Sequence, residues 1–497
     1  MNSTTAEKLE PVPSAVLHIT AAAGGGADRY IRDLAASNPR RHHVLHVGAG
    51  PTVAEDISAH RFVPVANLGA PGADHEALRR WLELSGIGIL HMHGVDETCR
   101  AHLDALLRAR SLSYLVTLHD LQFVNPRAFE ADGMPEPDAD WIVAIGPVLE
   151  RAAAVIAPSE FILDIALACS SGIRATVIPP GVRASPLRTV VEVPADFAAR
   201  APRRVVAVVG AVGPHKGSSV LASLATALNN SDIGVVVIGY TDTQIAPRWI
   251  VPGVLYVHGA YEDGTLGAWL AAYRVDAVLF PNRLPESFSY TLSEVWSAGV
   301  PVVVPDQGAL GERVKAEGGG WLLPAEFDGD DAAALLVWLS SDEGAAERAR
   351  VKSRIVPGDT RRVPTLEAMS RNVDALYARF GVPPLDSADP AVANDALAPL
   401  LAANLDGFAF RKELVKLAGE LDEATRQLAE SRQWSEKLER DGAAWAAKLE
   451  GDIAELKRDI ERLGAENRVL AERKAALEQL PPSIQKYLLR RALRARP

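Results

Sequence analysis

Cysteine is scarce in this sequence, which has only Cys99 and Cys169 among 497 residues. The two lie far apart, with no Cys-x-x-Cys or zinc-type spacing, so a disulfide framework and a cysteine-ligated zinc site are not expected. A pair of this kind suits a reducing compartment. The segment His91-Met92-His93 offers two imidazoles but no further ligands at a suitable spacing. We therefore expect no metal site.

The sequence also lacks an excess of basic residues and a long apolar run. Its formal net charge is −11, so a nucleic-acid partner, which calls for a basic face, is not expected. No stretch approaches the roughly 20 apolar residues of a membrane-spanning helix. Residues 1–13 are polar and lack the apolar centre of a signal peptide. These features predict a cytoplasmic protein.

The chain does contain two series of apolar strands that alternate with helical patterns. In the first, the expected strands are 16–19, 87–91, 114–118, 153–157 and 176–178, and in the second they are 205–209, 234–238, 255–257, 277–280, 302–304 and 320–323. Alternation of this kind predicts parallel α/β sheets. We expect two Rossmann-like domains, at 14–185 and 203–364, with a hinge between them and a cleft that the hinge can close.

Two carboxylates stand out in the second domain. Residues 285–301 read PESFSYTLSEVWSAGVP and place Glu286 in a loop after a predicted strand and Glu294 inside a predicted helix that ends at Gly299. At the carboxyl edge of a parallel sheet both can point into one crevice and accept hydrogen bonds from several hydroxyls. The alternative is an ordinary loop carboxylate and a solvated helix face.

A glycine-rich turn opens the same domain. The apolar strand 205–209 leads into Gly213-Pro214-His215-Lys216-Gly217 and then into a predicted helix at 218–228. Such a turn directs free backbone N–H groups and a helix dipole at one point, and Lys216 adds a full positive charge. The combination predicts a diphosphate site.

These two segments resemble the donor-site signature of the retaining family-four (group 1) glycosyltransferases of GT-B fold, and they are closest to bacterial surface-polysaccharide transferases. The resemblance spans roughly residues 14–380. It implies that Glu286 faces the donor sugar, Glu294 binds the nucleotide ribose and Lys216 grips the diphosphate. It places the following residues around the donor: Gly213, His215, Ser287, Phe288 and Ser289. Ala211 departs from the family, because many members carry an arginine there whose planar, bidentate contact alanine cannot replace.

The first domain adds further candidates through the same resemblance. Gly25 and Gly26 belong to a glycine loop ahead of a predicted helix, where the family has a Gly-Gly loop near the donor phosphate. His119 ends a strand, as does the family's histidine beside the reacting sugar and acceptor. The alternatives are a tight turn without ligand and a core histidine bonded to Asp120 or to backbone. The segment 308–312 is expected to form a loop before a helix, with Glu312 mainly structural.

The implied reaction moves a sugar from a nucleotide diphosphate sugar to a hydroxyl of a glycan or lipid-linked glycan, with retention at the anomeric carbon and without a cofactor. His119, Lys216 and Glu286 are the candidate catalytic residues. Two other classes remain open. A nucleotide-sugar epimerase of the same fold would need acid/base carboxylates that the sequence does not show. Ala211 and the carboxyl-terminal tail favour a catalytically weak scaffold that organises other transferases through a coiled coil.

The carboxyl-terminal part reads differently. A helix at 365–380 should return to the first domain, and a Pro- and Ala-rich linker at 381–410 follows. In the predicted coiled coil at 411–480, leucines recur every seven residues from Leu449 to Leu477 with Asn467 at a core position, which favours a parallel homodimer. A single solvated helix is the alternative. Residues 481–497 form a basic amphipathic segment suited to an anionic membrane, to a docking protein or to solvent.

Overall fold

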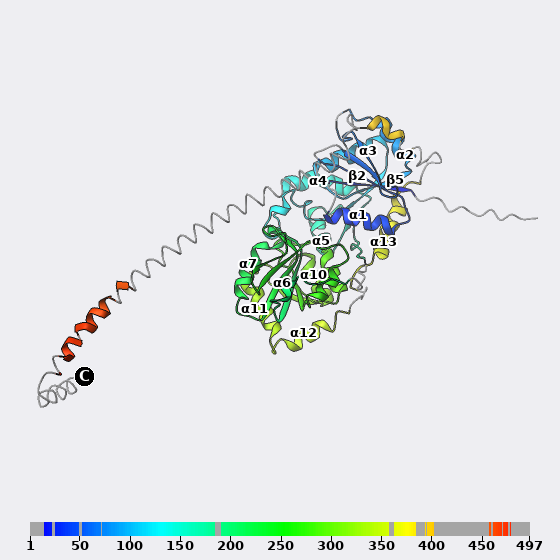
Figure 1. Cartoon of the computed structure of the whole chain (residues 1–497). Coiled ribbons are helices and arrows are strands. Elements are labelled where there is room, and N and C mark those ends of the chain that lie inside the picture. Colours follow the sequence, from blue (N-terminus) through cyan, green and yellow to red (C-terminus); the bar gives the residue numbers. More distant parts are fainter. Residues whose placement is uncertain are drawn as a thin grey trace, which may run out of the picture. The chain divides into compact units, whose positions relative to one another are not determined.

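The computed structural model describes residues 14–21, 25–48, 52–70, 72–183, 190–356, 362–383, 393, 395–401, 457–458, 461–469, 471–475 and 478. The chain divides into two compact units, Met1–Lys412 and Glu413–Pro497. The first unit holds two α/β domains, followed by a helix that packs on the first of them (Figure 1).

An eight-stranded sheet forms the amino-terminal domain, in the order β4-β3-β2-β1-β5-β6-β7-β8. Its strands are β1 (Ala15–Thr20), β2 (His42–His46), β3 (Thr52–Asp56), β4 (Arg61–Val65), β5 (Ile87–Met92), β6 (Ser113–Thr117), β7 (Ala154–Ala157) and β8 (Ala175–Val177). The expectation of a parallel sheet is correct from β2 to β8 but wrong at one edge, where β3 lies antiparallel to β2 and to β4. Strands β2 to β4 were not predicted, because histidines, carboxylates and a proline interrupt their apolar pattern.

Helices cover both faces of this sheet. They are α1 (Gly25–Ser37), α2 (His75–Leu84), α3 (Glu97–Ala109), α4 (Ala139–Arg151) and α5 (Glu160–Cys169). Side chains alternate along β1, so that Val16 packs toward α1 while Leu17 packs toward the cluster that includes α2 and α3. Asp74, Asp96, Asp138 and Ser159 cap the helices α2 to α5 by accepting hydrogen bonds from backbone N–H groups of the first turn.

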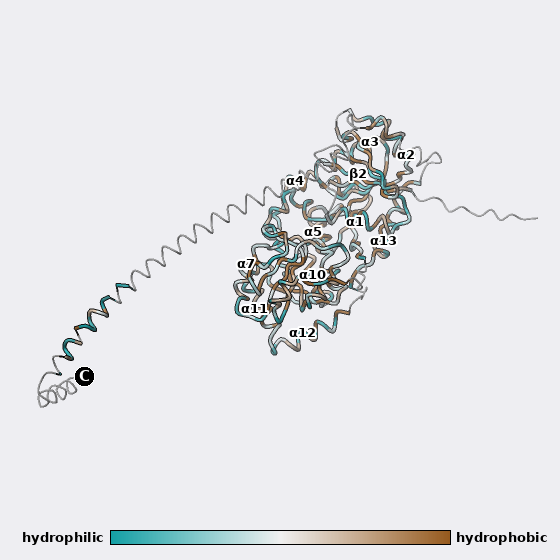
Figure 2. Tube along the Cα trace, viewed as in Figure 1, coloured by the Kyte–Doolittle hydropathy of each residue, from teal (hydrophilic) through white to brown (hydrophobic). Residues whose placement is uncertain are grey.

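The carboxyl-terminal domain is a seven-stranded sheet in the order β11-β12-β10-β9-β13-β14-β15. Its strands are β9 (Arg204–Val212), β10 (Ile233–Thr241), β11 (Arg248–Val251), β12 (Leu255–Gly259), β13 (Ala277–Leu279), β14 (Val302–Pro305) and β15 (Gly320–Leu323). All pairs are parallel except β11 with β12, and this short, half-exposed edge strand was not predicted. The hydrophobic residues of this domain gather in its interior (Figure 2).

The helices of this domain are α6 (Ala195–Ala198), α7 (Ser218–Ala227), α8 (Leu266–Ala272), α9 (Tyr290–Ser297), α10 (Gly308–Glu317), α11 (Gly329–Ser340) and α12 (Ala345–Lys352). The expectation of a loop at 308–312 is wrong, because α10 begins at Gly308 and already contains Glu312. Gly308 has φ 59°, and a Cβ there would lie 2.9 Å from the backbone oxygen of Glu286, so glycine is required where this helix meets the candidate loop.

Helix α13 (Leu366–Phe380) follows the second domain yet packs on the first, beside α1 (Figure 1). Arg40 donates to Asp374 at 2.6 Å, and the hydroxyl of Tyr377 lies 2.6 Å from His91 Nδ1. Part of the predicted linker also packs on the first domain, because Leu397 and Leu400 of the short helix η3 (Asp395–Leu400) are buried against it. The linker prediction is therefore wrong for these residues, whose apolar side chains have a core to enter.

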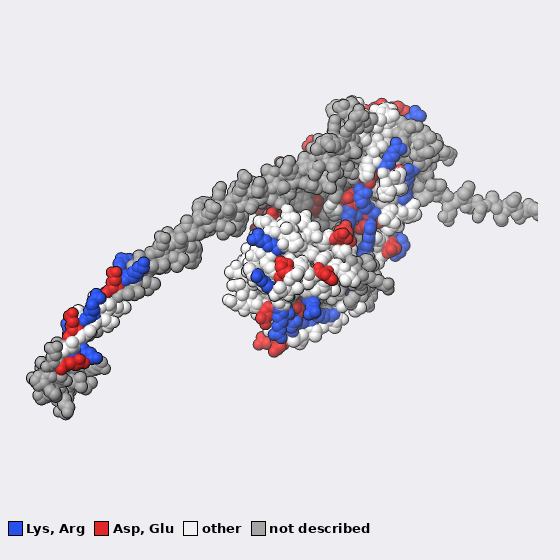
Figure 3. Space-filling view, in the orientation of Figure 1, with Lys and Arg blue, Asp and Glu red and all other residues white. Residues whose placement is uncertain are grey.

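In the second unit, residues 461–469 and 471–475 are helical. Basic and acidic side chains alternate along this described part (Figure 3), and Leu463 is 54% exposed. Most of the predicted coiled coil, including Leu449 and Leu477, and all of residues 481–497 lie outside the described residues. Within the described part of the chain, no helix has the length and apolar character needed to cross a membrane.

Candidate functional site

The glycine-rich turn of the second domain brings Lys216 to the end of strand β9. The turn contains the short helix η2 (Pro214–Lys216) and leads through Gly217 into α7. Gly217 has φ 77°, and a Cβ there would lie 1.8 Å from the backbone oxygen of Pro281, so no other residue fits. Ala211 is exposed on β9, which runs three residues beyond the predicted strand.

Glu286 lies beside this lysine. Its Oε1 accepts a hydrogen bond from Asn282 Nδ2 at 2.8 Å and is 3.7 Å from Lys216 Nζ. The loop itself is fixed at both ends, because the backbone oxygen of His215 accepts from the N–H of Leu284 at 3.0 Å and that of Glu286 accepts from Ala309 at 2.9 Å. The structure therefore brings together the predicted diphosphate lysine and the predicted sugar-facing carboxylate.

Ser287 joins the loop to the first domain, and Ser289 joins it to helix α9. Ser287 Oγ donates to the backbone oxygen of His119 at 2.5 Å, and the backbone oxygen of Ser287 accepts from Ser159 Oγ at 2.8 Å. Ser289 has φ 68° and caps α9 by accepting from Leu292 N. The ring of Phe288 is buried, with the Arg313 guanidinium 4.3 Å from its centroid. Phe288 thus supports the loop from inside the domain.

Glu294 meets the first domain directly. Its Oε1 accepts from Arg29 Nη2 at 2.6 Å, and the Arg29 guanidinium lies 4.4 Å from the centroid of the Tyr290 ring. Arg29 stands on α1, one turn after Gly25 and Gly26, which begin that helix and are exposed. Arg29 was not predicted as a site residue, although a cation in the first turns of a helix opposes the helix dipole, which indicates an acidic partner nearby.

His119 follows β6 and is partly exposed. Its Nε2 lies 2.8 Å from Nδ1 of His93, and burial lowers its pKa to about 4, so the ring is neutral at pH 7. The hydrogen-bond partner of its ring is thus His93, while Asp120, the partner in the alternative, accepts from the backbone N–H of Gln122. Since Ser287 bonds its backbone oxygen, His119 adjoins the loop that carries Glu286.

Glu312 joins the domains at another point. Its carboxylate accepts from the backbone N–H groups of Phe161 at 2.6 Å and Glu160 at 3.3 Å, in the first turn of α5. Arg283 similarly donates to Asp132 at 2.8 Å. Together with the contacts of Ser287 and Glu294, these bonds join the two domains beside the candidate residues.

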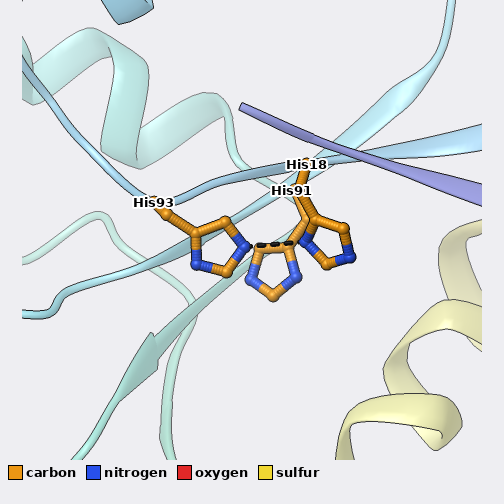
Figure 4. A group of neighbouring side chains, drawn as sticks. All are labelled: His18, His91 and His93. Carbon is orange, nitrogen blue, oxygen red and sulfur yellow. Dashed lines mark hydrogen bonds between the residues drawn. The ribbon is translucent and has the colours of Figure 1, made fainter. Parts of the chain in front are cut away.

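Among the described residues, the buried imidazoles of His18, His91 and His93 form a group that could hold a metal ion, with ligand nitrogens within 4.8 Å of one another (Figure 4). Each of their ring nitrogens already has a hydrogen-bond partner. The partners are His93 and His42 for His18, Tyr377 and Thr117 for His91, and His18 and His119 for His93. A metal ion would have to break these bonds, so this geometry favours a hydrogen-bonded cluster.

Comparisons with known proteins agree with this arrangement. Residues 24–185 match the family model described as Glycosyltransferase Family 4, and residues 192–355 match the one described as Glycosyl transferases group 1. No curated protein sequence matches the chain significantly.

Solved structures show the same fold at low identity. Sucrose-phosphate synthase from Thermosynechococcus elongatus is 18% identical, with a TM-score of 0.53 over 74% of this chain and 98% of that one. Anabaena HepE, in complex with UDP and glucose, is 16% identical, with a TM-score of 0.54 over 74% of this chain and all of that one. Because the two matched families together span most of the chain, the protein is a glycosyltransferase of GT-B fold, with a family 4 domain followed by a group 1 domain (EC 2.4).

Proposed function

We propose that this glycosyltransferase moves a sugar from a nucleotide diphosphate sugar to a hydroxyl of a glycan, with retention at the anomeric carbon, in the synthesis of a cell-surface polysaccharide. The observation that carries the proposal is the pair of Lys216 and Glu286, whose side chains lie 3.7 Å apart. The loop that carries Glu286 is also hydrogen-bonded, through Ser287, to His119 of the other domain. A cation beside a sugar-orienting carboxylate is what a diphosphate sugar requires. Anabaena HepE, of the same fold, has been crystallised with UDP-glucose.

Each residue then has one task. Lys216 and the N–H groups at the start of α7 stabilise the charge that develops on the leaving diphosphate. Glu286 accepts hydrogen bonds from sugar hydroxyls, and Glu294 accepts them from the ribose. The bond between the anomeric carbon and the diphosphate oxygen breaks, the acceptor oxygen bonds to the same face of that carbon, and the acceptor proton passes to the diphosphate. No cofactor or metal ion takes part in this proposal.

The test is a panel of UDP-, GDP- and dTDP-sugars, in which binding is read from the thermal midpoint and transfer from the released diphosphate nucleotide. We expect one nucleotide to raise the midpoint. The anomeric configuration of the product, read by NMR, then decides between retention and inversion. Binding without transfer to any glycan would favour the scaffold alternative. Its supporting observation is Ala211, which stands where many members of the family carry an arginine. Release of an epimerised sugar nucleotide would favour the epimerase.

The assembly belongs to the same proposal. A homodimer through residues 411–480, held at the cytoplasmic face of a membrane by residues 481–497, would bring the site to a lipid-linked acceptor. Exposure of Leu463, at a core position of the predicted heptads, supports the dimer. Co-sedimentation with anionic liposomes tests the membrane role, comparing the full chain with one that ends at Leu480, at low and high salt. Equal sedimentation would assign the tail to a protein partner such as another transferase.

A further inference from the structure

Four histidines of the amino-terminal domain form one continuous chain of hydrogen bonds. His119 Nε2 lies 2.8 Å from His93 Nδ1, His93 Nε2 lies 2.8 Å from His18 Nδ1, and His18 Nε2 lies 2.8 Å from His42 Nδ1. The chain begins at His119, a partly exposed residue, and continues through histidines that are at most 5% exposed. It crosses from the segment after β6 and the residue after β5 to β1 and β2, and these four strands are neighbours in the sheet. Figure 4 shows the bond between His18 and His93.

The far end of the chain fixes its direction. His42 Nε2 lies 3.3 Å from Oδ1 of Asn38. The orientation of this amide is set from both sides, because Oδ1 accepts from the backbone N–H of Arg40 at 3.0 Å while Nδ2 donates to Ser370 Oγ, whose own proton goes to the backbone oxygen of Ser37. An amide oxygen only accepts, so His42 must carry its proton on Nε2.

Every other proton position follows from this one. With its proton on Nε2, His42 can only accept at Nδ1, so His18 also carries its proton on Nε2, and the same step repeats at His93 and His119. The opposite direction would set a lone pair of His42 against the oxygen of Asn38 inside the core, which is unfavourable. Burial lowers the pKa of His42 to about 3 and that of His119 to about 4, so the rings stay neutral.

We propose that this imidazole chain, anchored at Asn38, is a positioning device that fixes His119 as the Nε2–H tautomer and leaves its Nδ1 as a hydrogen-bond acceptor for a substrate hydroxyl. Among the described residues, none has a hydrogen bond to that Nδ1. The imidazole chain fixes the tautomers and does not conduct protons, because the amide of Asn38 cannot take up a proton delivered along it. A neutral acceptor at this place suits a sugar or acceptor hydroxyl and repels a phosphate oxygen.

The tautomers can be measured without any substrate. In the full-length protein labelled with 15N-histidine, long-range 1H–15N correlation spectra distinguish rings protonated at Nε2, at Nδ1 or at both. Signals are assigned by their loss in His119→Gln and in His42→Gln. We expect Nε2–H rings for all four histidines at pH 7.5, with scalar coupling across the N–H···N bonds. An Nδ1–H ring or an imidazolium at His119 would overturn the proposal.

Two substitutions of Asn38 then test the positioning role. Asn38→Asp keeps an acceptor at the end of the chain and should preserve the tautomer, whereas Asn38→Leu removes it and should give a mixture at His119. For Leu, we expect kcat to fall about tenfold, the worth of one hydrogen bond, with less than a twofold change in donor KM. The matched control is His43→Gln, since His43 is a buried histidine of the same strand that packs on Trp81 and lies outside the chain.

The outcomes separate the two proposals. The link to turnover rests on the proposed function, but the spectra do not. If the parent protein shows the expected tautomers yet transfers no sugar, the proposed function is refuted, but the proposed tautomer of His119 is confirmed. If Asn38→Leu and His43→Gln lower kcat equally, or if Asp fails to restore what Leu loses, the effect is one of stability and the positioning role is refuted. If Asn38→Leu does not fold, the spectra of the parent protein still show whether His119 is the Nε2–H tautomer.

Discussion

The two domains of the first unit use ionisable side chains in opposite ways. The amino-terminal domain buries imidazoles in the middle of its sheet, among them His18, His91 and His93. In the described part of the carboxyl-terminal domain, the buried polar residues are Thr241, His258, Asn282, Ser293 and Arg313, and the strands are almost wholly apolar. Its candidate charges stand outside the strands, with Lys216 in the turn after β9, Glu286 in the loop after β13 and Glu294 in α9. We therefore expect substitutions of candidate site residues in the second domain to change activity without changing stability. In the first domain, substitutions of the buried histidines should change both.

The largest effect we predict is on turnover. Lys216→Ala should lower kcat about 100-fold or more, because the positive charge that stabilises the leaving oxyanion is lost. It should leave the thermal midpoint unchanged, because the lysine side chain is 37% exposed. Steady-state kinetics and calorimetry check both parts. The matched control is Lys352→Ala, another lysine of this domain, 48% exposed and 3.8 Å from a carboxylate. Equal activity of the two variants would remove Lys216 from the site.

Acid should separate the domains by stability. Burial and neighbouring imidazoles hold the pKa values of His18, His91 and His93 well below 6.5, so these rings bind protons only after unfolding. Between pH 6.5 and the folded pKa values the unfolded state carries more protons, and the free energy of unfolding falls as the pH falls. Each of these rings lowers the free energy of unfolding by about 1.4 kcal/mol for every pH unit in this range. No such loss arises from these groups above pH 6.5.

Several rings together reach the roughly 5–15 kcal/mol that a domain has in total. We therefore expect the amino-terminal domain to unfold between about pH 6 and 5 while the other stays folded. Hydrogen exchange of peptides from each domain, corrected for intrinsic rates, measures this. His43→Gln removes one ring whose pKa burial lowers to about 4 and should move the midpoint to lower pH. Simultaneous exchange in both domains would break the contrast between them.

The sequence predicted the second domain better than the first, for the same reason. Apolar strands such as β9 and β14 are continuous runs, and the loops between them carry recognisable residues, so Lys216 and Glu286 were found together with their strands. In the first domain, polar residues in β2 and β3 hid strands. The roles of His18 and His42 follow from pairing between strands far apart in sequence, which no local pattern contains.

The two glutamates of the second domain should differ in what they affect. Glu294→Ala should weaken donor binding by about 1–3 kcal/mol, because ribose hydroxyls lose their acceptor. Glu286→Ala should mainly lower kcat, because it acts on the reacting sugar. Isothermal titration and kinetics separate the effects. Glu317→Ala is the control, since that carboxylate is 40% exposed and 4.0 Å from Arg362. Donor affinity that is equal in all three variants would exclude the ribose role.

A smaller effect is predicted at the contact between the domains. Arg29→Met removes the ion pair with Glu294, which should cost about 1 kcal/mol or less and favour an open form. Small-angle scattering should show a larger radius of gyration. Arg32→Met is the control, because Arg32 stands on the same helix but bonds Glu55 within the first domain. The proposal of a closing contact fails if the control opens the molecule as much.

The smallest effect is expected from removing the second unit. A chain that ends at Lys412 keeps both domains, because the division into compact units falls there. A coiled coil stabilises itself on pairing and adds to the first unit only if the two are coupled, so the unfolding free energy of each domain should change by less than about 0.5 kcal/mol. Mass from light scattering should fall from a dimer to a monomer, with donor binding retained. An unchanged oligomeric state would place the dimer contact within the domains. A large loss of stability would mean that the contrast between the two domains depends on the tail.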